Sequence, residues 1–368
     1  MVYGTRLTSR PGRAELMTTT DLLPSAGRSV RLPSARGARV LGVLAFLAAK
    51  LVRVAVVLLL VSLVTFLVFY ILPADPARTE CGKLCTPQQL REAAAFMGLN
   101  KSVWMQYLDF LGGIFQGRSF GSHGDQISCA APCLGYSFQQ SRTVLSLIGE
   151  TFPVTLSIAL GAAVLWFVAG VAAGVLSALH RGKLVDRLVM TVAVVGVSAP
   201  AYLVALLLIL LLGFDLNWLP TGQYVPITQS PTQWAYHLIL PWCTLALVSA
   251  ALYARLTRGQ MLDALSEDYV RTARAKGLSE RRVITRHALR NVLIPVITVF
   301  GMDLGTLLGG AVLTEKVFSM YGLGALLIGA VGTTDLPVIA GVTLFAAACV
   351  VFANLIVDLT YKLLDPRI

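Results

Sequence analysis

The sequence predicts an all-α membrane protein with six transmembrane helices. Of its 368 residues, 56% are hydrophobic and 13% are charged, whereas an ordinary soluble domain has roughly 25% charged residues. A soluble fold could not bury this much apolar surface. Six apolar stretches reach about 20 residues or more, the length that crosses the hydrocarbon core as a helix. A helix also pairs its backbone amides within its own segment, as lipid requires.

The six stretches lie at 54–72, 152–179, 188–214, 234–254, 291–314 and 336–357. Each contains at most one titratable acid, base or histidine, such as Asp303 in the fifth. Pro200, Pro241 and Pro295 are among the prolines that lie within or near the ends of these stretches. Because proline removes a backbone donor, we expect the helices to bend at these positions.

Small residues recur at helical spacing in two of the stretches. Gly301, Gly305 and Gly309 are four residues apart in the fifth, and Gly170 and Gly174 are four apart in the second. This spacing lets helices approach closely. The sequence leaves open whether such helices slide during a working cycle or pack statically.

The distribution of cations predicts the orientation in the membrane. Segments 1–53, 180–187, 255–290 and 359–368 together hold 23 of the 30 Lys and Arg residues. Cytoplasmic loops carry this excess, so both termini are expected in the cytoplasm. The net charge of +11 is therefore explained by topology, and no nucleic-acid partner is expected.

Four parts follow from this topology. Residues 1–48, rich in Arg, Ser, Gly and Pro without an apolar period, are expected to form a flexible basic cytoplasmic tail. Residues 49–73 hold the first span, 74–150 form an extracytoplasmic insertion between spans one and two, and 151–368 form a core with the remaining five spans.

Two helices are expected in the insertion. Thr86 caps the first, with Pro87 in its first turn and an end near Gly98. The second, at 103–111, has one face of large apolar side chains: Trp104, Tyr107, Leu108 and Leu111. Such a stripe suits the membrane interface, a partner protein or packing within the insertion.

Four of the six cysteines lie in the insertion, in two C-x3-C groups: Cys81, Cys85, Cys129 and Cys133. An oxidising outer compartment favours disulfides, although the sequence does not fix their pairing. A four-cysteine metal site is the alternative, with a wider spacing than is usual for zinc. We therefore predict disulfides and no metal site.

Two common catalytic motifs are absent from the sequence. No segment reads G-x-x-x-x-G-K-[ST] or H-E-x-x-H, so the chain carries neither that phosphate cradle nor that zinc-protease pair. Ion-coupled carriers usually place several ionisable groups at mid-membrane, but Asp303 is nearly alone here. Asp303 is the candidate to line a pathway and meet a substrate amine, or to pair with a partner subunit. An ATP-independent six-span carrier or channel, and a membrane-embedded enzyme, are the competing readings.

The segment between the fourth and fifth spans, 255–290, carries the functional argument. It is expected to be a helix capped by Ser266, a left-handed turn at Gly277 and a second helix capped by Ser279. Its apolar residues form a ridge flanked by cations: Val270, Ala273, Leu278, Val283, Ile284 and Ala288. We expect this ridge to press into another protein; a loop lying flat on anionic headgroups is the alternative.

This segment resembles the EAA loop of the membrane subunits of ABC-type importers. Residues 268–278 read Asp-Tyr-Val-Arg-Thr-Ala-Arg-Ala-Lys-Gly-Leu, like the version found in dipeptide and oligopeptide permeases. Gly277 takes the place of the pattern's glycine, and His287 stands where the pattern has an apolar residue. Residues 69–76, 150–156 and 309–315 also resemble that family, and the resemblance covers roughly 49–368.

The resemblance implies a type I ABC importer permease in the cytoplasmic (inner) membrane. It implies a second homologous permease subunit, two ATPase subunits that hold ATP and Mg, and an extracytoplasmic substrate-binding protein. This chain would form half of the pathway for peptides, without a cofactor or ATPase site of its own. Some relatives import nickel or haem instead.

The residues expected to couple the chain to an ATPase are those that match the motif and its flank. They are Tyr269, Val270, Arg271, Ala273, Arg274, Lys276, Gly277, Leu278, Arg282 and His287.

Overall fold

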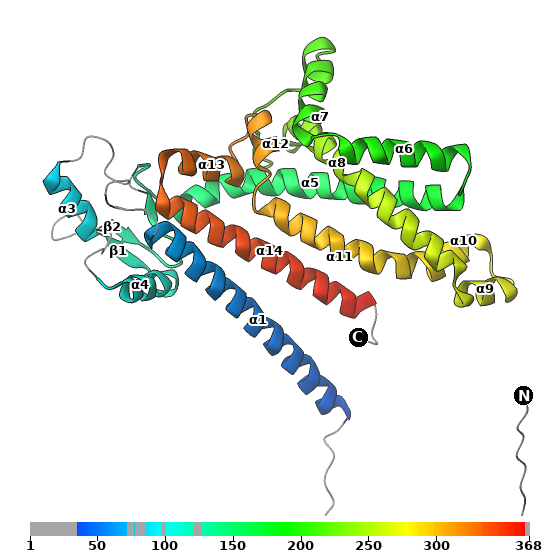
Figure 1. The fold of residues 1–368 in the computed structure, drawn as a ribbon, viewed down its shortest axis with the longest axis horizontal. Coiled ribbons are helices and arrows are strands. Elements are labelled where there is room, and N and C mark those ends of the chain that lie inside the picture. Colours follow the sequence, from blue (N-terminus) through cyan, green and yellow to red (C-terminus); the bar gives the residue numbers. More distant parts are fainter. Residues whose placement is uncertain are drawn as a thin grey trace, which may run out of the picture. The chain divides into compact units, whose positions relative to one another are not determined.

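The computed structural model describes residues 35–71, 77, 86–96, 101–120, 127–137 and 139–364 (Figure 1). The chain divides into two compact units between Ala49 and Lys50. In the first unit, helix α1 (Ala35–Ile71) begins well before the predicted span. Residues 35–48 are therefore helical, which corrects the expected flexible tail over that stretch, and residues 1–34 lie outside the described residues. The segment from 35 to 71 has no proline and is rich in Ala and Leu, which favour helix.

Among the described residues, five helices are long and apolar enough to cross a membrane, and a bent pair counts as a sixth crossing. The five are α1, α5 (Val144–Leu179), α8 (Pro231–Ser266), α11 (Leu289–Leu308) and α14 (Leu336–Leu364). This confirms the predicted all-α membrane fold.

The third predicted span is broken. It consists of α6 (Leu184–Ser198), α7 (Ala201–Leu208) and the π-helix η1 (Ile209–Asp215), and the two halves meet at an angle of 104°. Ala199 is extended, with φ −80° and ψ 126°, because the ring of Pro200 disfavours helical backbone in the residue before it. The expected bend at Pro200 is therefore confirmed, and it breaks the predicted third span into two helical halves.

The fifth span is shorter than predicted. Helix α11 ends at Leu308 rather than at residue 314, and α12 (Val312–Val317) and α13 (Leu323–Thr333) follow before α14 begins. Gly310 has φ +132° and lies so close to the next turn that an added Cβ would sit 2.9 Å from the Gly324 Cα atom. Glycine permits both the left-handed backbone and this close approach, so the chain leaves the helix here.

A fully buried carboxylate holds this connection in place. Glu315 is 0% exposed. Its Oε1 accepts hydrogen bonds from Thr155 Oγ1 (2.7 Å) and from the Ala311 amide (3.2 Å), and its Oε2 accepts one from the Ala325 amide (2.8 Å). Thr155 Oγ1 in turn accepts from the Leu323 amide at 2.8 Å. Residues of α5, α12 and α13 are thus joined by one side chain.

The insertion contains α3 (Pro87–Phe96), α4 (Val103–Gln116) and two antiparallel strand pairs. One pair is β1 (Arg118–Phe120) with β2 (Ile127–Cys129), and the other is β3 (Tyr136–Ser137) with β4 (Arg142–Thr143). The bounds of α3 agree with the expected cap at Thr86, and α4 runs five residues beyond the expected end at residue 111.

The insertion shares its core with the spans that follow it. Phe110 and Leu134 belong to one buried cluster with Val144 of α5, Leu326 of α13 and Val338 of α14. Asp335, at the turn before α14, adds a polar link, because its carboxylate accepts a hydrogen bond from the Ser137 hydroxyl at 2.5 Å. The boundary expected at residue 150 is therefore not a boundary in packing.

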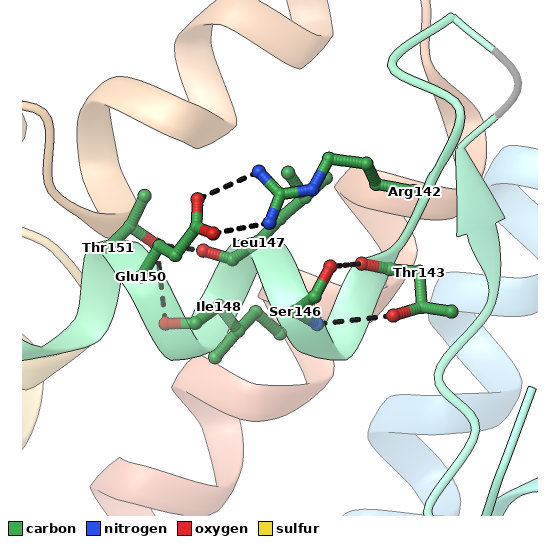
Figure 2. A network of polar contacts seen from close by, with 7 residues as sticks. All are labelled: Arg142, Thr143, Ser146, Leu147, Ile148, Glu150 and Thr151. Atoms are coloured by element: carbon green, nitrogen blue, oxygen red, sulfur yellow. Dashed lines mark hydrogen bonds and ion pairs between the residues drawn. The ribbon is translucent and has the colours of Figure 1, made fainter.

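Helix α5 begins before its apolar run (Figure 2). Thr143 caps it, and the Thr143 Oγ1 accepts a hydrogen bond from the Ser146 amide at 3.3 Å. The Arg142 guanidinium forms a two-pronged ion pair with Glu150, one bond of which measures 2.8 Å from Nη1 to Oε2. The cap and the ion pair fix the helix start at Val144, ahead of the predicted residue 152.

The glycine spacing corresponds to close helix contacts. A Cβ at Gly170 would lie 2.5 Å from Tyr253 Cβ of α8, and one at Gly301 would lie 1.8 Å from Val357 Cγ2 of α14. Gly305 and Gly309 also pack against α14, and Gly309 is in addition the C-cap residue of α11. The small residues thus allow α5 to approach α8 and α11 to approach α14.

Candidate coupling segment and transport pathway

The coupling segment, residues 255–290, continues directly from a span. Helix α8 runs unbroken to Ser266, and the N-cap of the next helix, α9 (Asp268–Ala275), is Glu267. The Ser266 hydroxyl instead donates to the Asp263 carbonyl at 2.7 Å. The prediction that Ser266 caps the helix is therefore wrong by one residue, because α8 continues through it.

The turn at Gly277 has the predicted left-handed conformation, with φ +75°. The Leu278 amide donates to the Ala273 carbonyl (3.3 Å), and the Gly277 amide donates to the Arg274 carbonyl (2.9 Å). These two bonds form a Schellman motif, which satisfies carbonyls at the helix end. Ala273 and Leu278 also belong to one apolar cluster, the contact that usually accompanies this motif.

The second helix of the segment is continuous with the fifth span. Ser279 is extended and precedes α10 (Glu280–Arg282), which passes through the π-helix η2 (Val283–Ala288) into α11. The Ser279 carbonyl accepts from the Arg282 and Val283 amides at 2.9 and 3.0 Å. The segment is therefore joined to the fourth and fifth spans by helical backbone. The helix is interrupted only at Glu267 and at the turn around Gly277.

The apolar ridge faces inward, which corrects the expectation that it presses into another protein. Val270 and Val283 are 0% exposed and Ala273 is 5% exposed, and they form a cluster with Leu265 and Leu278. Ile284 and Ala288 pack into the neighbouring cluster of α5, α8 and α11. The two short helices are too close together to leave the ridge uncovered, so it serves as the core of the segment itself.

The polar face of the segment is exposed. Tyr269 is 38% exposed, and Arg271, Lys276 and Arg282 are exposed, whereas His287 is half-buried. Arg274 bridges the turn, because its Nε donates to Glu280 Oε1 at 2.8 Å. A neighbouring protein would therefore meet a cationic surface with one aromatic side chain, held by a small apolar core.

A cluster that sequence reasoning missed joins this segment to the turn between α5 and α6. Asp186 is 4% exposed. It accepts two bonds from Arg258 of α8, Nε to Oδ1 at 2.6 Å and Nη2 to Oδ2 at 2.9 Å. It also accepts from Ser177 Oγ (2.5 Å) and from the Gly182 amide (2.9 Å). We call Asp186, Arg258, Ser177 and Gly182 the clamp.

Asp303 lies beside a cavity of about 400 Å³, which Trp166, Ser249 and Thr306 also line. Tyr253, which is 0% exposed, donates its hydroxyl to Asp303 Oδ2 at 2.8 Å. Asp303 is half-buried, and it lines the cavity. This arrangement can accept a hydrogen bond from an amine or an amide that enters the cavity.

The structure describes one of the two C-x3-C groups of cysteines. Cys129 and Cys133 are joined by a disulfide, so their sulfurs are not thiolate ligands for a metal. Cys81 and Cys85 lie outside the described residues. Within the described part of the chain, no three side chains of His, Cys, Asp or Glu gather closely enough to hold a metal ion.

The clamp and Glu315 differ in whether a pattern in the sequence points to them. Residues 309–315 stood inside a recognised stretch, so Glu315 could have been singled out as the only carboxylate there. In the sequence, Arg258 is only one of the cations of segment 255–290, and Asp186 belongs to no motif. Their pairing joins positions 72 residues apart, which no local pattern in one sequence reveals.

Two family models match the chain. The first, the binding-protein-dependent transport system inner membrane component, matches residues 170–368, and its N-terminal companion matches residues 43–159. The first model therefore covers the bent span, the coupling segment and the clamp.

Several curated proteins are similar over most of their length. The di/tripeptide transport system permease protein DppB of Pseudomonas aeruginosa is 40% identical, over 89% of this chain and 99% of that protein. A putative peptide transport system permease protein of Brucella abortus is 38% identical over 81% of this chain and 90% of that protein. The glutathione transport system permease protein GsiC of Escherichia coli is 38% identical over the same shares.

Proposed function

This chain belongs to the family of binding-protein-dependent transport system inner membrane components, and we propose that it forms one half of the translocation pathway of an ATP-driven peptide importer. A second homologous permease subunit supplies the other half. Two ATPase subunits, with ATP and Mg²⁺, drive the cycle from the cytoplasm. An extracytoplasmic binding protein delivers the substrate.

The observation that carries this proposal is the coupling segment. Its motif, residues 268–278, folds as a capped unit with its own core, and its cationic face is exposed. An ATPase groove with acidic residues is the partner that this face fits. When the ATPases close on ATP, the segment moves with them, and the populations of inward-open and outward-open states shift.

The connections of the segment support its role as a lever. Helix α8 is unbroken from Pro231 to Ser266, and the other end of the segment runs into α11 as helix. The clamp ties α8 to the start of α6 through the buried Asp186. A displacement of the segment is therefore passed to three helices rather than absorbed by a flexible loop.

The pathway in this proposal passes Asp303. Peptides carry an α-ammonium group and amide N–H donors, and a half-buried carboxylate beside a cavity of about 400 Å³ is suited to accept them. The names of three relatives specify di/tripeptides, peptides and glutathione, which supports short peptides as the substrate class. The excess of Lys and Arg in segments 1–53 and 255–290 supports the placement of both termini and of the coupling segment in the cytoplasm.

The test uses the assembled complex in proteoliposomes, with ATP hydrolysis and uptake of a labelled dipeptide measured together. In the Gly277→Val variant we expect the complex to assemble, uptake to fall at least about tenfold and hydrolysis to lose its stimulation by the binding protein. A β-branched residue strains the left-handed backbone at this position, where nothing lies within 4 Å of an added Cβ.

The matched control is Gly277→Asn, because asparagine tolerates the left-handed region. It should retain most of the coupled uptake. Normal uptake by the valine variant would refute the lever, and equal loss in both variants would show that the side chain rather than the backbone matters.

A carrier that works without ATP is the competing function. It predicts dipeptide uptake by the purified chain alone, driven by a concentration gradient. We expect neither that uptake nor ATP hydrolysis from the chain by itself; either one would overturn the requirement for ATPase partners.

A further inference from the structure

Helix α4 presents an apolar stripe that the proposed mechanism does not use. Trp104, Met105, Leu108 and Phe115 are exposed over 67%, 52%, 60% and 80% of their surface. Trp104, Leu108 and Phe115 are separated by four and seven residues, so they lie on one side of the helix. An uncovered apolar stripe of this size marks a surface that contacts a protein or a membrane.

The neighbouring face of α4 packs against α1. The rings of Tyr107 and Phe66 lie 5.4 Å apart, and those of Phe110 and Phe66 lie 6.2 Å apart. The Tyr107 hydroxyl is 3.0 Å from Ser62 Oγ and 3.3 Å from the Leu59 carbonyl. These contacts fix the rotation of α4 about its axis, so the stripe cannot turn into the core.

The contacts with α1 also fix the depth of α4 relative to the bilayer. Leu59 and Ser62 lie inside the apolar stretch Ala48–Val68 that is expected to span the membrane. Leu59 precedes Val68 by nine residues, or about 13 Å of helix, which is nearly half of a hydrocarbon core of about 30 Å. A helix whose tyrosine reaches the Leu59 carbonyl therefore lies beside the span, within the thickness of one leaflet.

The surroundings of the stripe are apolar as well. Over the same stretch, α1 exposes Leu60 (57%), Val64 (58%) and Val68 (39%). At this depth the surroundings are acyl chains rather than water. Exposed apolar side chains on both helices are stable in that environment. Tryptophan also favours the boundary between chains and headgroups.

Gln106 and Asp109 of α4 lie on other sides of the helix than Trp104 and Phe115, by the 3.6-residue period. A cavity of about 390 Å³ is lined by Gln106, Asp109 and Gln116, by Lys101 and Arg118, and also by Leu108 of the stripe. Asp109 is the only charged residue within α4, and it is paired with Lys101. Such a separation of apolar and polar sides is typical of helices that lie in a membrane interface.

We propose that α4 is embedded in the lipid leaflet beside the outer half of α1, with Trp104, Leu108 and Phe115 in contact with acyl chains. The insertion is then anchored to the bilayer by a helix of its own. This proposal depends on α1 crossing the membrane and does not depend on the substrate or on the ATPase partners.

Site-specific photocrosslinking tests the proposal. The assembled complex, with benzoylphenylalanine at Leu108 or at Phe115, is placed in nanodiscs of phosphatidylethanolamine and phosphatidylglycerol and irradiated. Mass spectrometry of the chain should find lipid adducts at both positions, several-fold above the same probe at Gln106, which lies on the opposite side of the helix. Crosslinks to another protein, or no adduct above the Gln106 level, would overturn the proposal.

Fluorescence quenching gives a second measurement that requires no probe on the stripe. Trp104→Phe is compared with the wild-type complex in nanodiscs whose lipids carry bromine on the acyl chains. We expect the substitution to reduce the quenched fraction of the tryptophan signal, since a Trp104 side chain in contact with acyl chains is within reach of the quencher. An unchanged quenched fraction would place Trp104 outside the lipid and refute the embedding.

Discussion

The coupling segment and the connection between α11 and α14 are both short excursions of the chain, but they are stabilised differently. Around the turn at Gly277 in the coupling segment, the bonds join near neighbours, such as Leu278 to Ala273 and Arg274 to Glu280. In the connection, Glu315 accepts from Thr155, which lies 160 residues earlier, and Asp335 accepts from Ser137, 198 residues earlier.

This difference predicts how each region responds to substitution. A locally stabilised unit tolerates changes that respect its backbone, because each bond is shared with adjacent residues. A connection that depends on one buried side chain loses several bonds at once when that side chain is removed. We therefore expect the largest losses of stability where a side chain that makes long-range contacts is removed, and smaller losses from changes at the turn around Gly277.

The largest effect is expected for Glu315→Ala. The substitution leaves the Ala311 and Ala325 amides and the Thr155 hydroxyl without their acceptor in a buried site, at about 1–3 kcal/mol for each group. The apparent Tm of the purified complex should fall by many degrees, and Glu315→Gln, which keeps one acceptor oxygen, should fall less. A Tm of the alanine variant equal to wild type would contradict the role of Glu315 in fixing the connection.

Substitutions in the clamp should have the next largest effect. Two variants of Arg258 distinguish a loss of stability from a loss of coupling between ATP hydrolysis and uptake. Arg258→Met leaves the buried Asp186 without its charged partner, at a cost on the order of 2–3 kcal/mol. Arg258→Lys keeps the charge but loses the two-pronged geometry, so we expect a small loss of Tm and a clear fall in dipeptides imported per ATP. If the lysine variant keeps the wild-type ratio, the clamp is structural only.

Within the coupling segment, the expected change in stability is small. Gly277→Val strains one left-handed residue, at about 1–3 kcal/mol, and Gly277→Asn should be near wild type in Tm. Local proteolysis or hydrogen exchange of residues 268–290 measures this directly. Global unfolding of the complex by the valine variant would contradict the independence of this unit.

The smallest effect is a change in pH dependence at Asp335. Burial raises the pKa of Asp335, and the hydrogen bond from Ser137 lowers it in part. Since the folded pKa is above the usual value of 3.8, the folded state binds more protons than the unfolded state in the interval between the two values. The stability that this proton contributes is present below about pH 4 and is lost as the pH rises through the folded pKa.

Asp335→Asn should therefore flatten the fall of Tm as the pH rises above about 4, since asparagine does not titrate. Asp109→Asn, at an exposed ion pair with Lys101, is the control and should leave that slope in place. The same slope in wild type and in Asp335→Asn would show that another group sets the pH dependence.

The sequence could predict what is encoded in neighbouring residues. Apolar length gives the spans, Pro200 gives the bend, and the left-handed Gly277 gives the turn of the coupling segment, because each depends on backbone sterics or on lipid as solvent. Predictions that relied on a helix beginning where its apolar run begins were wrong, as at Val144, because capping residues extend a helix past that run.

What only the tertiary structure decided is which faces are covered. Val270 and Val283 were expected to contact a partner, but they bury one another, because the turn at Gly277 brings the two helices together. Asp186 and Glu315 look like ordinary charges in the sequence, and only the fold brings Arg258 and Thr155 to them. Helix formation depends on a few adjacent residues, whereas the burial of a charge depends on partners that are distant in the chain, and one sequence alone does not record that distance.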